Sequence, residues 1–326
     1  MRTTQLLQSR SKFGLVFAIA LVLSVPQLHA QWNATIGAQS ADLSWQALAF
    51  LPNEMWIHAG DSITWTIATD EPHTLTLLTA TQVRNPFFVG CPGYSSSPAT
   101  FDGSTCVSSP PLAPGQAFTV AFPSAGNFKI SCLFHENMTG IIHVRSASQS
   151  LPHEQAFYDN EAKQAQAAVL GGMGDHAHNM AAATGNHVTA GTGAILATGG
   201  GSHTVSLVRF MQGKVTIHAG GTVQWTNQYP ITPHTITFGT EPQDVQDPSA
   251  DVTVDADGSR HAIIREASDS THSGFIQAGS QDRIGLPQSA PGVTRFRVTF
   301  TKAGRYPYIC ALHDGLGMKG VVVVLP

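Results

Sequence analysis

A long internal duplication constrains this chain more than any other feature of its sequence. Segment 50–77 (FLPNEMWIHAGDSITWTIATDEPHTLTL) aligns with 210–238 (FMQGKVTIHAGGTVQWTNQYPITPHTITF), and 113–132 aligns with 290–310. The first pair shares Ile-His-Ala-Gly, a tryptophan five residues after the glycine, and Pro-His-Thr. Because two separate stretches recur in the same order, the repeating unit is a whole domain rather than a short solenoid repeat.

The periodicity inside each copy is that of β-strands. Apolar residues alternate with polar neighbours in both copies: Ile63, Trp65 and Ile67; Phe118, Val120 and Phe122; Phe296, Val298 and Phe300. A period of two predicts half-buried antiparallel strands. Short strands separated by turns rich in glycine and proline favour an all-β fold built from two β-sandwiches.

The N-terminal residues 1–30 read as a secretory signal peptide. Basic residues precede an apolar run over 13–25, which is short for a membrane span, and Leu28-His29-Ala30 suits a signal peptidase. We therefore expect a periplasmic or secreted protein with no membrane span after cleavage. The leader holds three of the 17 basic residues and none of the 21 acidic ones, so the remainder has a formal charge of −7. This charge argues against nucleic acid as a partner.

The remaining chain divides into a first domain at 31–147, a linker at 148–186 and a second domain at 187–326. Within the linker, 152–172 has a helix-like composition that Gly171-Gly172 ends, which predicts one short helix. His176 and His178 follow it. They could bind a metal ion, but scattered histidines in a linker are commoner, and we leave them outside the predicted site.

Each copy places a cysteine, a histidine and a methionine close together at the end of a predicted strand. The sequences are SCLFHENMTG (131–140) and YICALHDGLGMKG (308–320). Pro-His-Thr supplies a further histidine from an earlier strand end of each copy. The predicted metal ligands are therefore His73, Cys132, His135 and Met138 in the first domain and His234, Cys310, His313 and Met318 in the second. A thiolate, two imidazoles and a weak axial thioether are the ligands of a type 1 (blue) copper site.

Both copies resemble cupredoxins, the blue copper family that includes plastocyanin, azurin and amicyanin. The spacing Cys-x-x-His-x-x-Met in the first copy is similar to amicyanin, and Cys-x-x-His-x-x-x-x-Met in the second is similar to plastocyanin. The resemblance covers most of 40–147 and 190–326. It implies two tandem Greek-key β-sandwiches, each holding one copper that cycles between Cu(I) and Cu(II).

The resemblance also implies a route for electrons. In the family they leave through the exposed edge of the loop histidine, within an apolar patch. Here His135 and His313 would be the exits, next to Leu133, Phe134, Ala311 and Leu312. The family often has asparagine after the first histidine, where this chain has Thr74 and Thr235; a hydroxyl can replace that hydrogen bond.

The leading functional expectation is electron transfer with a redox protein or a membrane-bound electron-transfer complex, and not enzymatic turnover. A copper nitrite reductase or a two-domain multicopper oxidase would need further histidines directly beside the cysteine. Here Ser131 and Leu133 flank one cysteine, and Ile309 and Ala311 flank the other. Copper storage or delivery stays open as a second alternative.

Cys91 and Cys106 remain after the ligand cysteines are assigned. They lie in a loop rich in glycine, serine and proline that has no cysteine pair in the second copy. A disulfide is the default interpretation in an oxidising compartment, and a third metal site is the weaker alternative.

Overall fold

The computed structural model describes residues 29–82, 91, 93–135, 137–171, 185–229, 232–278 and 292–326. Nearly all regular structure within these ranges is β-strand, with one helix. Residues 1–28 of the predicted signal peptide lie outside the described residues, as do His176 and His178.

The first domain is a sandwich of two mixed sheets. One sheet contains, in order, β2 (Trp45–Leu51), β1 (Gln31–Gln39), β4 (Ser62–Ile67), β8 (Ala117–Ala121) and β6 (Ala99–Thr100). The other contains, in order, β3 (Glu54–His58), β10 (Thr139–Arg145), β9 (Gly126–Ser131), β5 (Thr76–Leu77) and β7 (Val107–Ser108). The predicted alternation is confirmed, because Ile63, Trp65, Phe118 and Val120 all lie in the core between the sheets.

The second domain repeats this arrangement. One sheet contains, in order, β12 (Gly201–Met211), β11 (His187–Thr198), β14 (Thr222–Thr226), β19 (Arg295–Phe300), β17 (Arg260–Ile264) and β16 (Thr253–Val254). The other contains, in order, β13 (Lys214–His218), β21 (Lys319–Leu325), β20 (Gly304–Ile309), β15 (Thr237–Phe238) and β18 (Thr271–His272). The predicted fold class, two tandem all-β sandwiches, is confirmed.

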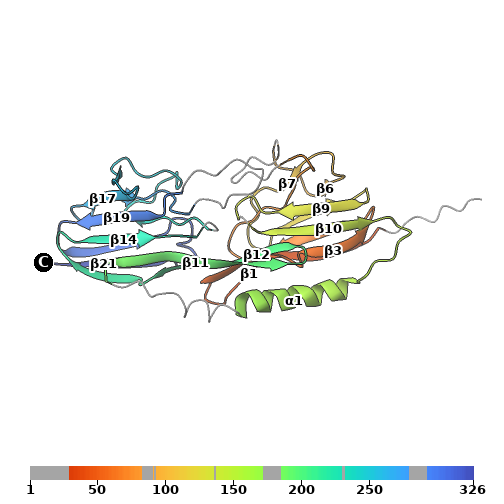
Figure 1. Ribbon diagram of the computed structural model, residues 1–326, viewed down its shortest axis with the longest axis horizontal. Coiled ribbons are helices and arrows are strands. Elements are labelled where there is room, and N and C mark those ends of the chain that lie inside the picture. The colour runs from red at the N-terminus through yellow and green to blue at the C-terminus, as the bar shows by residue number, and fades with distance from the viewer. Residues whose placement is uncertain are drawn as a thin grey trace, which may run out of the picture.

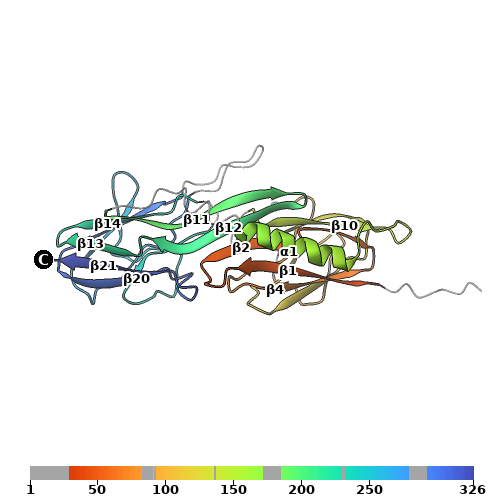
Figure 2. The same cartoon turned by 90° about the horizontal axis from the view of Figure 1, so that it is seen from below.

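The predicted linker helix is α1 (Gln155–Gly171), and it packs on the outside of the first domain beside β1, β2 and β12 (Figure 2). Its most buried side chain is Tyr158, whose hydroxyl accepts a hydrogen bond of 2.9 Å from the backbone N–H of Trp56. Val169, near the other end of the helix, packs in an apolar cluster with Ala47 and Val205. The helix therefore fastens the chain between the domains to the first sandwich.

One sheet is continuous across the two domains. Strand β12 belongs to the second domain, yet it pairs antiparallel with β2 of the first, from Thr204 opposite Leu48 to Leu207 opposite Trp45. Figure 1 shows the sandwiches end to end along the long axis, with the long β11–β12 hairpin reaching from one to the other. Main-chain hydrogen bonds therefore hold the domains together in addition to the side-chain contacts.

The disulfide predicted from the sequence is confirmed. Cys91 and Cys106 are bonded, with their Cα atoms 5.4 Å apart. Their separation of 15 residues closes a loop that contains the edge strand β6 and ends just before β7.

Candidate copper sites

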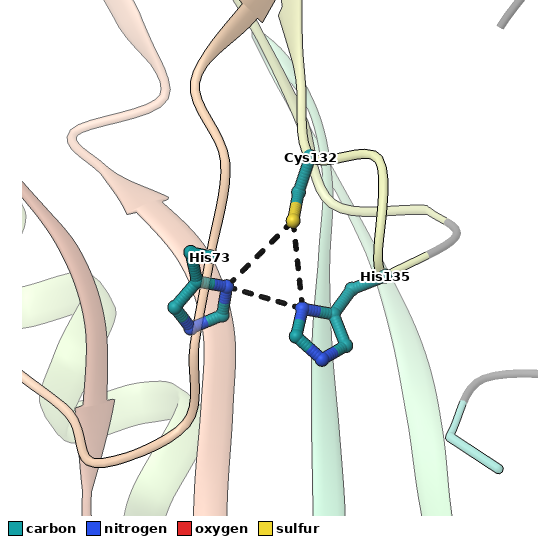
Figure 3. Close-up of side chains that lie close together, drawn as sticks. All are labelled: His73, Cys132 and His135. Carbon is teal, nitrogen blue, oxygen red and sulfur yellow. Dashed lines mark hydrogen bonds between the residues drawn. The ribbon is translucent and has the colours of Figure 1, made fainter. Parts of the chain in front are cut away.

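Three predicted ligands of the first domain converge on one point. The Nδ1 atom of His73 lies 3.8 Å from the Cys132 sulfur and 3.1 Å from Nδ1 of His135. The third side of this triangle, from the Cys132 sulfur to Nδ1 of His135, measures 3.5 Å (Figure 3). Donor atoms bound to one metal at about 2.0–2.3 Å are separated by such distances.

The second domain builds the same triangle. His234 Nδ1 lies 3.8 Å from the Cys310 sulfur and 3.2 Å from Nδ1 of His313. The distance from the Cys310 sulfur to Nδ1 of His313 is 3.3 Å. Among the described residues, these two triads are the groups of His, Cys, Asp or Glu that could hold a metal ion, and all six side chains are buried.

The scaffold histidine of each site is fixed by its own backbone. His73 forms an isolated β-bridge with Leu112, with N–H to O distances of 3.3 and 2.8 Å. His234 forms the equivalent bridge with Ile276, at 3.2 and 2.9 Å. Because main-chain bonds hold these residues, the backbone of each scaffold histidine is anchored outside the loop that carries the other ligands.

The two methionines are buried where each copper loop returns to the sandwich. The carbonyl of Met138 accepts a hydrogen bond of 3.1 Å from the Cys132 N–H, and that of Met318 accepts one of 3.0 Å from the Cys310 N–H. Both loops therefore close on the residue that carries the ligand thiol. Axial ligation by either thioether stays a prediction.

As the sequence suggested, a threonine hydroxyl in each domain links the strand of the scaffold histidine to the cysteine loop. The Thr74 hydroxyl accepts a hydrogen bond of 2.8 Å from the N–H of Leu133, and the Thr235 hydroxyl accepts one of 2.7 Å from the N–H of Ala311. The backbone N–H groups of the same threonines approach the ligand sulfurs, at 3.5 Å in the first domain and 3.3 Å in the second. Each threonine therefore joins the scaffold histidine to the cysteine loop and solvates the thiolate.

A pair of glycines, not singled out in the sequence, makes room for the scaffold histidines. Gly37 in β1 and Gly191 in β11 have φ of +71° and +72°, and both lie where the strand pairing shifts register. A Cβ at Gly191 would overlap Nε2 of His234, and one at Gly37 would overlap Thr69 and lie 3.0 Å from Nε2 of His73. The signal was available, because Thr35-Ile36-Gly37 and Thr189-Ala190-Gly191 hold equivalent places in the two copies.

The surroundings favour thiolates at both cysteines. Burial alone would raise the pKa of the Cys132 thiol, but the charge of His135 and hydrogen bonds from His135 and His73 hold this pKa well below its usual range. The Cys310 thiol behaves in the same way beside His313 and His234. For the loop histidines, burial opposes a proton, yet the thiolate and Glu71 raise the pKa of His135 to about 9 and that of His313 to about 10.

A buried carboxylate stands between the two sites. Oε1 of Glu71 lies 3.2 Å from Nε2 of His135 and 3.4 Å from Nε2 of His313. Burial would raise the pKa of Glu71, but the charges and hydrogen bonds of the two histidines hold it well below its usual range. No sequence pattern selects Glu71, because its place between the two histidines arises only where the two sites face each other.

The expectation of exposed loop histidines is wrong. His135 is 3 % exposed and His313 is 2 % exposed. Both line a cavity of about 220 Å³ between the domains, together with Phe134 and Leu312. The physical reason is that the faces predicted to meet a partner protein pack against each other, with Glu71 between them.

A β-sandwich with a buried His₂Cys triad in each of two domains is the architecture of a copper-binding protein of the electron-transfer type. The sequence matches the copper binding proteins of the plastocyanin/azurin family over residues 38–145 and again over 197–325. The chain therefore belongs to the plastocyanin/azurin family of copper-binding proteins.

Solved cupredoxin structures resemble parts of the chain. A reduced variant of amicyanin is 19 % identical, with a TM-score of 0.24, and the match covers 35 % of this chain and 82 % of the amicyanin chain. A purple cupredoxin from Nitrosopumilus maritimus is 21 % identical, with a TM-score of 0.24, and the match covers 35 % of this chain and 99 % of the other. The family assignment depends on the sequence match over both domains and not on these two similarities.

The residues of each triad fit copper. A soft thiolate and two imidazoles meet at a buried point, and the donor set suits both oxidation states of copper. Bound copper would supply reversible one-electron chemistry, and the protein would contribute the thiolate and imidazole ligands at a buried point. One copper in each domain follows.

Proposed function

We propose that this protein transfers single electrons outside the cytoplasm through one type 1 copper in each domain, without turning over a substrate at copper. The observation that carries the proposal is the duplicated, buried triad. In each copy an equivalent threonine, Thr74 or Thr235, joins the scaffold histidine to the cysteine loop. A redox centre whose ligands do not move between oxidation states exchanges electrons readily. With Met138 or Met318 as the predicted fourth ligand, the copper would have no open position for an inner-sphere substrate.

The residues beside the ligand cysteines support a role in electron transfer rather than catalysis. Neither Ser131 and Leu133 nor Ile309 and Ala311 can supply the imidazoles that would bind a catalytic copper next to the type 1 centre. Electron donors and acceptors would be small redox proteins or a membrane-bound complex, as is usual for cupredoxins.

The proposed location has two supports. Residues 1–30 have the pattern of a signal peptide, and the Cys91–Cys106 disulfide is of a kind that persists in oxidising compartments. No helix among the described residues is both long and apolar enough to cross a bilayer. We expect mature protein beginning near Gln31, which N-terminal sequencing of the exported chain would test.

One set of measurements tests the function. Purified protein should bind two coppers, show thiolate-to-copper absorption that disappears on reduction, and return to the oxidised spectrum after one electron per copper is removed. Supplied with an electron donor and either dioxygen or nitrite, it should not show sustained turnover. Turnover that depends on a copper distinct from the two blue ones would instead indicate an oxidase or reductase. Rapid transfer of copper to a chelator, with slow electron exchange, would indicate storage or delivery.

A further inference from the structure

We propose that Glu71 couples the two copper sites, by accepting hydrogen bonds from the loop histidine of each domain and so providing the route by which an electron passes between them. The inference builds on the proposed electron-transfer function and adds an internal step to it. In this role Glu71 is a positioning residue, since it touches the ligands and not the metals.

The geometry of the two imidazoles directs them at Glu71. Nδ1 of His135 and Nδ1 of His313 face their respective cysteine sulfurs, so Nε2 lies on the opposite side of each ring. A histidine that binds a metal through Nδ1 keeps its proton on Nε2 and donates it. Both Nε2 atoms lie within 3.4 Å of the same oxygen, Oε1 of Glu71. A carboxylate oxygen has lone pairs for two such donors.

The bridge is asymmetric in origin. Glu71-Pro72-His73 in the first domain corresponds to Thr232-Pro233-His234 in the second. The Thr232 hydroxyl is buried and has no hydrogen-bond partner in the structure. The first domain therefore supplies the carboxylate for both sites, and the second domain supplies only its histidine.

The first domain holds Glu71 in place. The Glu71 N–H donates a hydrogen bond of 3.2 Å to the Thr69 hydroxyl, which in turn bonds to the side chain of Gln46. The whole Glu71 residue is 6 % exposed. A charge buried at this depth is costly unless it is paired, so the two imidazole N–H groups explain why a carboxylate is tolerated here.

The surrounding interface fixes the second domain against this carboxylate. Arg209 of β12 donates a hydrogen bond of 2.6 Å to the carbonyl of Leu316, in the second copper loop, and another of 2.6 Å to the carbonyl of Asp42, in the first domain. The backbone N–H of Val208 donates one of 2.8 Å to the carbonyl of Ser44. The ligand loop of the second site is thus held to the first domain by contacts that do not involve Glu71.

The resulting route runs from one ligand set to the other through side chains in hydrogen-bond contact: Cys132, His135, Glu71, His313 and Cys310. With copper bound by both triads, one electron would pass from the Cu(I) site to the Cu(II) site, so that one site would be oxidised as the other is reduced. No covalent bond forms or breaks, and each imidazole keeps its Nε2 proton. An external redox partner need only supply the first electron and remove it afterwards.

The test is the rate of electron exchange between the sites in half-reduced protein, measured after rapid injection of less than one electron per chain. Glu71→Ala removes the bridge and should slow exchange by about tenfold or more, equivalent to about 1.4 kcal/mol of activation free energy. Glu71→Gln keeps the size of the side chain and one acceptor oxygen. Its exchange rate should therefore lie between that of Glu71→Ala and that of the natural chain. Thr232→Val, at the matched position of the second domain, should leave the rate unchanged.

A second measurement detects the bridge without any electron transfer. In copper-free protein, NMR of the histidine rings should show slowly exchanging Nε2–H signals from His135 and His313, to be assigned apart from those of other buried histidines such as His272. Both signals should shift in Glu71→Gln and stay in place in Thr232→Val. If only the His135 signal shifts, Glu71 serves one site and the proposed coupling is wrong.

The outcomes separate this inference from the proposed function. If all variants keep two blue coppers that accept electrons, but Glu71→Ala exchanges electrons as fast as the natural chain, the bridge is not the route and the electron-transfer function stands. If neither copper is reduced reversibly, the proposed function fails. A third metal that is lost in Glu71→Gln would show that Glu71 and the histidines form a metal site instead.

Discussion

The segments Glu71-Pro72-His73 and Thr232-Pro233-His234 occupy equivalent places in the two domains, and one residue distinguishes their roles. Both hold a scaffold histidine in an isolated β-bridge, and both continue into a threonine that ties the copper loop. Only the first presents a carboxylate, which lies against the loop histidines of both domains. The comparison teaches that both copies of the duplicated unit kept the metal-binding residues, while the carboxylate that lies between the two metal sites comes from a single residue of one copy.

A second difference concerns how each domain secures its periphery. The first domain closes a loop with the Cys91–Cys106 disulfide. In the second domain, the described loop around 255–261 is held by charge pairs instead, since Arg297 bonds Asp257 at 2.7 Å and Asp255 at 3.0 Å. Half-exposed pairs of this kind contribute little to stability, so the two domains should respond differently to loss of their peripheral bonds.

The largest expected effect separates the two copper signals. Cys132→Ser should remove the thiolate-to-copper absorption of the first domain, roughly half of the total if the sites absorb equally, and Cys310→Ser should remove the rest. The reason is that the absorption requires the thiolate, which serine does not supply. Each variant serves as the control for the other. A spectrum left intact by either substitution would show that the site in that domain is misassigned.

The next effect tests the peripheral difference. Removing the disulfide with Cys91→Ala and Cys106→Ala should lower the free energy of unfolding of the first domain by about 3 kcal/mol, the value that chain entropy gives for a loop of about 15 residues. Urea-induced loss of copper absorption can be followed for the first domain in Cys310→Ser protein and for the second in Cys132→Ser protein. An equal shift in both domains would mean that the disulfide acts on the whole molecule.

Replacing Gly37 or Gly191, the glycines next to the scaffold histidines, should weaken copper binding by more than backbone strain alone explains. Gly37→Ala and Gly191→Ala impose a left-handed conformation costing about 1–2 kcal/mol and also push a side chain toward His73 or His234. Gly115→Ala and Gly220→Ala are matched controls, with φ of +76° and +86° and open space around the new methyl group. Copper affinity should fall in the first pair only. Equal losses in all four variants would leave strain as the whole cause.

The smallest expected effect is a difference in pH dependence between the sites. A proton on His135 or His313 competes with copper, because the pKa values of these residues are raised to about 9 and about 10. Copper affinity should therefore rise with pH, by about tenfold per unit for one displaced proton, and level off at a higher pH in the second domain. Competition with a chelator in the two single-site variants measures this. An affinity that does not change between about pH 6 and about pH 9 would contradict it.

Most ligands of each site could be predicted from the sequence, but the way in which the two sites face each other could not. His73, Cys132 and His135 could be predicted because their types and spacing recur in the second copy, and recurrence makes chance unlikely as an explanation. Glu71 could not, because its role arises from packing between domains, which no pattern within one domain encodes. For the same reason the prediction of exposed edges at His135 and His313 failed: an apolar patch around a histidine looks the same in sequence whether it meets a partner protein or a second copy of its own domain.

The continuous sheet has a consequence for how the chain can be divided. In a separated first domain, β2 would become a bare edge strand, with Ala47, Leu48 and Phe50 along a nearly uninterrupted apolar run. Unpaired N–H and C=O groups on such an edge recruit strands from other molecules and promote aggregation. The β11–β12 hairpin of the second domain thus covers the edge of the sheet of the first domain. An excised first domain would need either β12 or charged substitutions within β2 to remain monomeric.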